Sequence, residues 1–117
     1  MTIRGEGTAQ TSIQQGLAKA WINFNGTGTI ATRDSHNVTS ITDDGTGSYT
    51  ITINNDMANA NYCTTSGLAR AGLATCTFVN DGAWAAATGS GAVLCANNSN
   101  AAFDAPAVLA SFLGDLA

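Results

Sequence analysis

The segment from Gly16 to Asn54 constrains this chain more than any other part, because strand-forming residues alternate there with threonine, serine and asparagine, and glycine recurs where the chain must reverse. Its clearest part predicts a β-hairpin, in which Val38–Thr42 leads into the turn Asp43–Gly47 and the chain returns as Ser48–Asn54. Such a pattern is typical of a rigid surface rather than of a reaction centre.

The returning strand predicts which of its faces is buried. Alternation places its large apolar residues on one face: Tyr49, Ile51 and Ile53. Thr50 and Thr52 then point to solvent, where a β-branched side chain suits the pleat and its hydroxyl stays hydrated. Val38 and Ile41 are out of phase by one residue, which predicts a bulge or bend near Thr39–Ser40.

A period of two also predicts an earlier strand with one buried face. Its inward and outward residues are, respectively, Ala20, Ile22 and Phe24, and Trp21, Asn23 and Asn25. The dipeptide Asn25-Gly26 ends this strand and predicts a turn with positive φ.

The flanking segments predict an arm before this region and short strands after it. Residues 1–15 are polar, so we expect a flexible or partner-ordered attachment arm that ends in one helical turn, with Ser12 as its N-cap and Gly16 at its end. Weaker strands are expected at Asn61–Thr65, Cys76–Asn80, Ala92–Ala96 and Val108–Leu113. Together these elements predict an all-β fold, a single β-sandwich or jelly-roll-like head domain over residues 16–117.

Charge and hydropathy exclude two kinds of partner. Only 10% of the residues are charged, the net charge is −4 and the four basic residues are scattered, so no nucleic-acid binding is expected. The longest apolar runs, Ala83–Ala87 and Ala105–Ala110, are far shorter than the ~20 residues of a spanning helix, so no membrane insertion is expected. Residues 1–12 lack the apolar core of a signal peptide, so classical secretion is not expected either.

The cysteines and the glycosylation sequons have plain interpretations. Cys63, Cys76 and Cys95 are odd in number and lack CxxC spacing, which favours three small apolar fillers in a reducing cytoplasm. A Cys63–Cys76 or Cys76–Cys95 disulfide stays open. N-x-S/T sequons begin at Asn25, Asn37 and Asn97. In a chain so rich in asparagine and threonine we interpret them as a consequence of composition.

No motif predicts catalysis, a metal site or a cofactor. His36, the single histidine, lies within Arg33–Asn37, and consecutive residues of a strand point to opposite faces, so we expect a solvated histidine rather than a Ser/His/Asp set. Asp43–Ser48 could offer oxygens to Ca²⁺, but it lacks the downstream glutamate of an EF-hand loop, which favours a plain hairpin turn. Gly26–Thr29 lacks the lysine of a phosphate-binding loop.

Trp21 is the aromatic side chain best placed for a second interface, because it lies opposite Ile22 and Phe24 in the predicted strand. Another copy of this chain is the favoured partner. Burial in the sandwich core and stacking on a sugar are the two alternatives.

Three runs within Gly16–Tyr62 carry a resemblance to a known family: LAKAWINFNGTGT, RDSHNVTSITDDGTGSYTI and NNDMANANY. They resemble a domain found at the distal ends of bacteriophage tail fibres and in related fibre or decoration proteins. Residues 110–117 resemble the final strand of that family, and residues 63–105 match weakly. The resemblance implies a β-rich head that works as a homotrimer in a virion, without catalytic residues. The chain shows no shaft repeats, so we expect a fragment of a fibre or a small stand-alone virion protein.

The resemblance implies a phage virion structural protein, made in the bacterial cytoplasm, whose tail-fibre-type head is expected to bind the host cell surface. The alternative is a trimeric capsid or tail decoration or spike protein with a purely structural role. A depolymerase fragment is least favoured, because most of the carboxylates lie in turns. The expected partners are other copies of the chain, further virion proteins through residues 1–15, and a host surface glycan or protein.

Recognition is expected on exposed loops, because loops on a rigid scaffold can vary without unfolding it. The candidate loops are Asp43–Ser48, Asn54–Asn61 and Ala83–Asn100, of which the last is preferred. Its candidate binding residues are Trp84, Asn97, Asn98 and Asn100, whose indole and amides suit sugars. Trp21 and Phe112 are the candidate subunit-interface residues.

Overall fold

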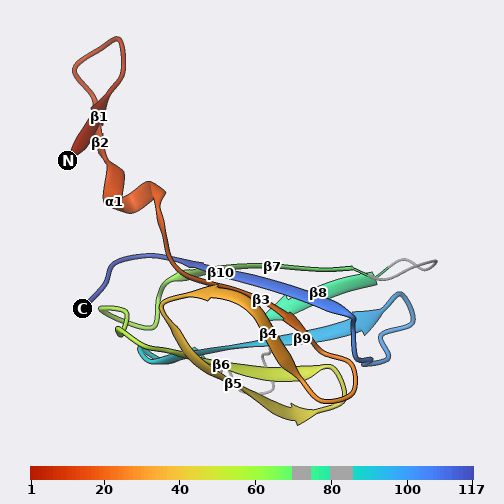
Figure 1. Ribbon diagram of the computed structural model, residues 1–117. Coiled ribbons are helices and arrows are strands. Elements are labelled where there is room, and N and C mark those ends of the chain that lie inside the picture. The colour runs from red at the N-terminus through yellow and green to blue at the C-terminus, as the bar shows by residue number, and fades with distance from the viewer. Residues whose placement is uncertain (70–74, 80–85) are drawn as a thin grey trace.

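Two antiparallel β-sheets of four strands each enclose the hydrophobic core (Figure 1). The computed structural model describes residues 1–69, 75–79 and 86–117. Its elements are β1 (Thr2–Arg4), β2 (Gln10–Ser12), α1 (Ile13–Gly16), β3 (Ala18–Asn25), β4 (Ala31–His36), β5 (Val38–Gly45), β6 (Ser48–Ile53), β7 (Cys63–Ala69), β8 (Thr75–Val79), β9 (Ser90–Asn97) and β10 (Ala107–Leu113). One sheet has the order β4-β3-β10-β7 and the other β5-β6-β9-β8. With 59% strand and 4% helix, the structure confirms the predicted all-β, sandwich-like domain.

The core confirms both strand phases that the sequence predicts. The inward residues of β3 and β6 are Ala20, Ile22, Phe24, Tyr49, Ile51 and Ile53, each at most 3% exposed. Val93 and Cys95 of β9 and Val108 and Phe112 of β10 are fully buried against them. Both central strands of each sheet therefore supply the core.

The β5–β6 hairpin forms where it is predicted, and its register shifts between Val38 and Ser40, at the expected bulge. Strand β4 is not predicted by the sequence pattern. It is an edge strand whose residues are exposed except for the half-buried Ser35, so it lacks the alternation that would reveal it. Its pairing with β3, from Trp21 opposite His36 onward, makes it a strand.

The buried hydroxyl of Tyr49 joins three loops at one end of the sandwich. It lies 2.9 Å from the carbonyl oxygen of Gly26 and 2.9 Å from Oδ1 of Asp104. The same carboxylate oxygen accepts the N–H of Gly47 at 2.8 Å. The N–H of Gly26 donates to the carbonyl oxygen of Ala105 at 2.9 Å. We call this group of contacts the tyrosine junction.

The turn after β3 needs glycine at position 26 for space. A Cβ on Gly26 would collide with the Tyr49 hydroxyl and lie 2.9 Å from the carbonyl oxygen of Ala105. The positive φ of this turn, 61°, belongs to Gly28. The positive φ expected at Asn25-Gly26 is therefore wrong, because close packing rather than turn geometry selects this glycine.

The second tyrosine, Tyr62, holds the opposite end of the sandwich. Its hydroxyl lies 2.6 Å from the carbonyl oxygen of Ser90 and 3.0 Å from that of Ala87. Its ring packs edge-on against Phe112, with centroids 5.6 Å apart, as the ring of the first tyrosine packs against Phe24 at 5.0 Å. Each end is thus tied by a tyrosine whose ring is in the core and whose hydroxyl bonds to loop backbone.

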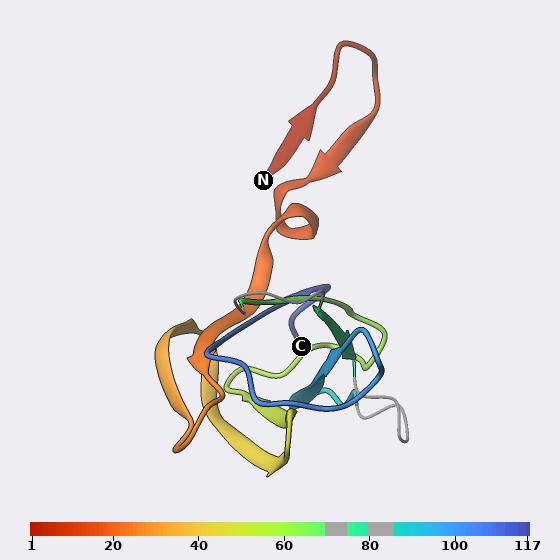
Figure 2. The same cartoon turned by 90° about the vertical axis from the view of Figure 1, so that its right-hand side faces the viewer.

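Residues 1–16 form an arm that stands clear of the sandwich (Figures 1 and 2). It consists of the hairpin β1–β2 and the single turn α1. Ser12 occupies the predicted N-cap position, but its side chain makes no capping hydrogen bond. At the base of the arm the Lys19 ammonium donates to the carbonyl oxygens of Gln14 and, at 2.6 Å, Leu17. The arm that the sequence predicts is therefore a folded hairpin, and the hydrogen bonds of Lys19 hold its base.

The cysteine expectations are partly wrong. Cys63 and Cys95 both carry free thiols, so neither of the two disulfide pairings forms. Cys95 is a buried filler as expected, whereas Cys63 is exposed because it begins β7 on the outward side. The side chain of Cys76 lies outside the described residues. Nowhere in the described part of the chain is a helix both long and apolar enough to span a membrane.

Ile51→Ala should lower the free energy of unfolding by about 2–5 kcal/mol, because the side chain is fully buried and its loss leaves a cavity. Thr52→Ala, on the other face of the same strand, should change it by less than about 1 kcal/mol. Urea denaturation followed by circular dichroism measures both. Equal losses from the two substitutions would show that the phase of β6 is wrong.

Alkaline pH should destabilise the fold through the core. Burial, with the charge of Asp104 adding to it, raises the pKa of Cys95 from 9.0 to about 11. Burial and the hydrogen bond to Asp104 raise the pKa of Tyr49 above its usual 10.0. Both groups therefore ionise first in the unfolded chain, so the free energy of unfolding should fall above about pH 9, by up to ~1.4 kcal/mol per pH unit for each group.

Urea midpoints measured at intervals from neutral pH to about pH 11 test this decline. Cys95→Ala should start from a lower stability but lose less of it between about pH 9 and pH 10, where the thiol dominates the titration. Equal slopes for wild type and variant in that interval would contradict the assignment.

Candidate binding surfaces

The turn Asp43–Ser48 and the loop 97–101 lie at the end of the sandwich away from the arm, which we call the distal end (Figure 1). Strand β3 runs from the arm toward it, and the antiparallel partners bring the turn Asp43–Ser48 and the loop 97–101 to the same end. The N–H of Cys95 in β9 donates to the carbonyl oxygen of Gly47 at 2.8 Å, so the turn Asp43–Ser48 is bonded to the strand that leads into the loop 97–101. Together with the tyrosine junction, this bond holds the distal loops in a common arrangement.

The side chain of Asn97 organises the loop 97–101. Its Oδ1 accepts the N–H of Ser99 at 2.9 Å and that of Ala101 at 3.0 Å. Asn98 and Asn100 are exposed at the tip, and Asn100 has a φ of 60°. Of the three asparagines predicted to bind a ligand, Asn97 thus uses its carbonyl to shape the loop, while the side chains of the other two face solvent.

The preferred recognition region, Ala83–Asn100, is wrong as a single loop. Residues 90–97 of it are β9, a central strand that pairs with both β6 and β8 and buries Val93 and Cys95 in the core. Trp84 lies outside the described residues. The loop Asn54–Asn61 lies at the arm end, where Ala58 bonds to the Asp115 carbonyl at 2.8 Å. The candidate loops therefore lie at opposite ends of the molecule rather than on one surface.

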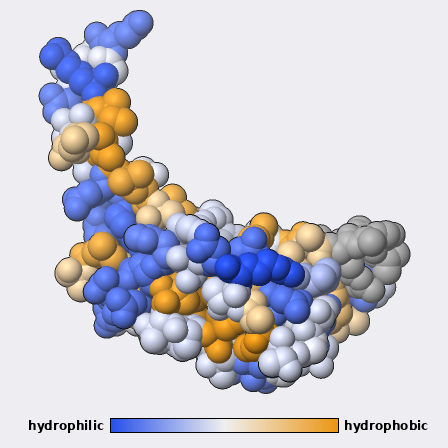
Figure 3. Space-filling model, viewed as in Figure 1, coloured by the Kyte–Doolittle hydropathy of each residue, from blue (hydrophilic) through white to orange (hydrophobic). Residues whose placement is uncertain are grey.

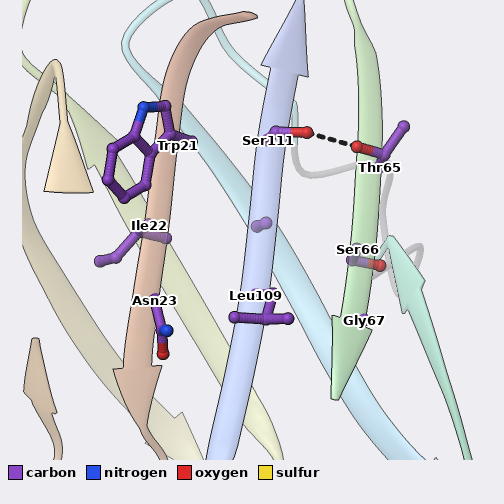
Figure 4. A pocket seen from close by; sticks show the side chains of 9 residues that line it. Trp21, Ile22, Asn23, Thr65, Ser66, Gly67, Leu109 and Ser111 are labelled. Atoms are coloured by element: carbon purple, nitrogen blue, oxygen red, sulfur yellow. Dashed lines mark hydrogen bonds between the residues drawn. The ribbon is translucent and has the colours of Figure 1, made fainter. Parts of the chain in front are cut away.

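A second surface lies on the outer face of the sheet β4-β3-β10-β7. Register places three rows of outward residues across it: Trp21, Ser111 and Thr65 in one, and Asn23, Leu109 and Gly67 in the next, with Cys63 opposite Leu113 beyond them. The first two rows line a hollow of about 490 Å³, which we call the lateral hollow (Figure 4). The hollow is open beside Gly67, because even a Cβ at this position would have no atom closer than the Leu109 side chain at 4.0 Å. The hydroxyls of Thr65 and Ser111 bond to each other on its rim.

Trp21 and Leu109 give the lateral hollow its apolar character, being 37% and 43% exposed. The alternative that Trp21 belongs to the sandwich core is therefore wrong. The edge strand β4 brings polar side chains beside the hollow: His36 lies opposite Trp21 and Asp34 opposite Asn23, and the guanidinium of Arg33 donates to Oδ1 of Asn23 at 3.3 Å. The strand pattern could have revealed Leu109, because an inward Val108 forces its neighbour outward.

Phe112 is wrong as a subunit-interface residue. It is fully buried within its own chain, in edge-on contact with Tyr62. A Cβ on Gly91 of the opposite sheet would lie 2.6 Å from its ring, which shows how closely the two sheets approach there. Leu109, three residues earlier on the outward side of the same strand, is exposed and lines the lateral hollow.

The remaining sequence candidates are structural. His36 is exposed at the end of β4, as expected of a solvated strand-edge histidine. The Asp43–Ser48 segment is a plain hairpin turn, in which Asp43 Oδ1 accepts the N–H of Gly45 at 3.1 Å. Among the side chains of residues 1–69 and 86–117, no three of His, Cys, Asp or Glu are grouped to hold a metal ion.

The distal end and the lateral hollow differ in chemistry. The distal end is built from loops and is polar, while the lateral hollow is apolar and lies on three paired strands. Comparison of the chain with protein-family models, curated proteins and solved structures finds no match. What the protein does is therefore inferred from these surfaces and from the sequence.

Proposed function

We propose that this protein is a non-catalytic head domain of a bacteriophage virion, of the tail-fibre type, and that its distal end binds the host cell surface. The placement of the arm and the loops carries this proposal: the arm leaves at one end of the sandwich, and the loops Asp43–Ser48 and 97–101 lie at the other (Figure 1). A head that is held by its arm turns these loops away from its support. The resemblance of Gly16–Tyr62 to tail-fibre heads supports the same function.

The chemistry of the distal end suits a glycan or a polar protein surface. Asn98, Asn100 and Thr46 are exposed there, and their amides and hydroxyl offer both donors and acceptors. The loop bases are held by the tyrosine junction, so the tips lose little additional freedom when they bind. Binding by such loops needs no titratable group.

The lateral hollow supports association of the head with other copies of the chain, as a homotrimer in the virion. An exposed tryptophan and leucine that line one hollow are typical of the centre of a protein interface. Only 10% of the residues are charged, which fits a chain that is partly covered by its own copies. Trp21 and Leu109 are the proposed contact residues.

A purely structural decoration or spike protein is the second candidate. The exposed arm favours it, because attachment to a capsid or tail needs only this segment and no contact by the distal loops. The two candidates therefore differ in what the distal end does.

Asn98→Ala combined with Asn100→Gly should reduce attachment of the fluorescently labelled protein to bacteria by at least about tenfold, if each lost amide contributes a net hydrogen bond. Glycine is chosen at position 100 because φ is 60° there. Flow cytometry on a panel of bacterial strains measures attachment, and circular dichroism checks the fold. Thr42→Ala, an exposed change on β5, is the matched control.

Two outcomes would contradict the receptor-binding function. Attachment that survives the double substitution would exclude these tips as the binding site. A wild-type protein that binds none of the strains, but does bind virions stripped of it, would favour the decoration protein.

Trp21→Ser combined with Leu109→Ser should convert the trimer to a monomer near 11.8 kDa, because the apolar centre of the contact is removed. Sedimentation equilibrium at micromolar concentration measures the mass. Circular dichroism should still show a folded β domain, since neither side chain belongs to the core. A double variant with the mass of the wild type, or a wild type that is itself monomeric, would refute the proposed contact.

A further inference from the structure

The hairpin of the arm has two free edges whose backbone groups the structure identifies. The N–H of Ile13 donates to the carbonyl oxygen of Met1 at 3.0 Å, and the N–H of Gly5 to that of Ala9 at 3.4 Å. Bonded and non-bonded pairs alternate along an antiparallel ladder. The odd-numbered residues of β1 and β2 therefore bond to each other inside the hairpin.

The even-numbered residues turn their N–H and C=O groups outward. On β1 these are Thr2 and Arg4, and on β2 they are Gln10 and Ser12. The hairpin stands clear of the sandwich, so no other strand of the described chain pairs with either edge (Figure 2). An exposed edge of this kind is a template for pairing with another strand, and a two-stranded hairpin alone is marginally stable in water.

The two faces of the hairpin also differ in chemistry. Residues opposite one another in register share a face, so Ile3 lies beside Thr11, and Met1 and Ala9 lie on the same side. Met1 is 94% and Ile3 60% exposed. The other face carries the polar side chains Thr2, Arg4, Gln10 and Ser12. The arm is an amphipathic hairpin whose apolar face is open, and Figure 3 shows hydrophobic surface along it.

We propose that the arms of neighbouring copies of this chain pair edge to edge, β1 of one copy with β2 of the next, in an antiparallel ring whose apolar faces turn toward a shared axis. The inference rests on the proposed function only in requiring that copies associate. It assigns the arm a second role, that of an assembly module.

Two observations favour a second copy over a foreign strand. The two free edges of one arm complement each other, since each offers two residues of outward donors and acceptors with the same spacing. A ring of copies therefore pairs both edges of every arm and covers Ile3, whereas one foreign strand leaves an edge open. Arg4 is the single charged residue of β1 and β2, so no like charges face each other across a β1–β2 contact.

Ser12→Pro tests the pairing with little disturbance of the arm itself. Ser12 already has a φ of −65°, the value that proline imposes, and its side chain makes no cap. The substitution removes an outward N–H and no bond inside the hairpin. It should weaken self-association by at least about tenfold in sedimentation equilibrium, while Ser12→Ala, which keeps the N–H, should change it less than about twofold.

Amide hydrogen exchange, measured by NMR, is a second test. If the arms did not pair, the exchange rates of the outward amides would not depend on assembly. In the assembled protein the outward amides of Arg4, Gln10 and Ser12 should exchange at least about a hundredfold more slowly than in the dissociated chain. The inward amide of Thr11, which is bonded within the hairpin itself, should differ less between the two states and serves as the internal comparison.

Fast exchange of the outward amides in an assembled protein, or equal association of the Ser12→Pro and Ser12→Ala variants, would overturn the inference. Protection that appears only when stripped virions are added would overturn it in favour of a virion partner. Cell attachment by the distal end is measured separately. Its loss in the Asn98 and Asn100 variant leaves the arm untouched, so the two proposals fail independently.

Discussion

The hydroxyl of Tyr49 is the contact on which the arrangement of the distal loops depends. Its ring lies in the core against Phe24, and its oxygen reaches the carbonyl of Gly26 and the carboxylate of Asp104. Covalent chain alone would leave the turns after β3 and β5 and the β9–β10 connection as separate mobile segments. Because one buried side chain bonds to two of them and Asp104 reaches the third through Gly47, the loops inherit the rigidity of the core.

The three surfaces of the molecule differ in the backbone structure on which they lie. The distal end consists of loops whose bases are bonded, the lateral hollow consists of paired strands, and the arm is a hairpin with both edges open. Strands hold Trp21 and Leu109 at a constant separation, which suits a contact that must repeat identically between copies. Loop tips such as Asn98 tolerate change, which suits a surface that must discriminate among partners.

The fold was predictable where burial alternates with exposure, and the sites were not. The β3 and β6 phases and the bulge beside Ser40 follow from local side-chain pattern, because one face of each strand is in the core. Strand β4 has no such pattern, since it is held by its neighbour rather than by burial. The prediction of Phe112 at an interface is wrong because the sequence predicts the strand Val108–Leu113 but does not determine which face of that strand packs on the other sheet. The need for glycine at position 26 depends on Tyr49, which is distant in the chain, so no local rule could reveal it.

The way Asn97 closes its loop has a consequence for how this surface can diversify. Its side-chain oxygen and its backbone N–H bond to Ala101 and close the base of the loop, while its two oxygens also accept the N–H groups of Ser99 and Asn100. A segment inserted between Asn98 and Ser99 would lengthen a loop that is already closed, and doubling its length adds only ~0.6 kcal/mol of closure entropy. The domain thus has the properties of a display scaffold. Randomised or grafted peptides inserted between Asn98 and Ser99 would be presented on a sandwich whose strand pairing and core stay unchanged.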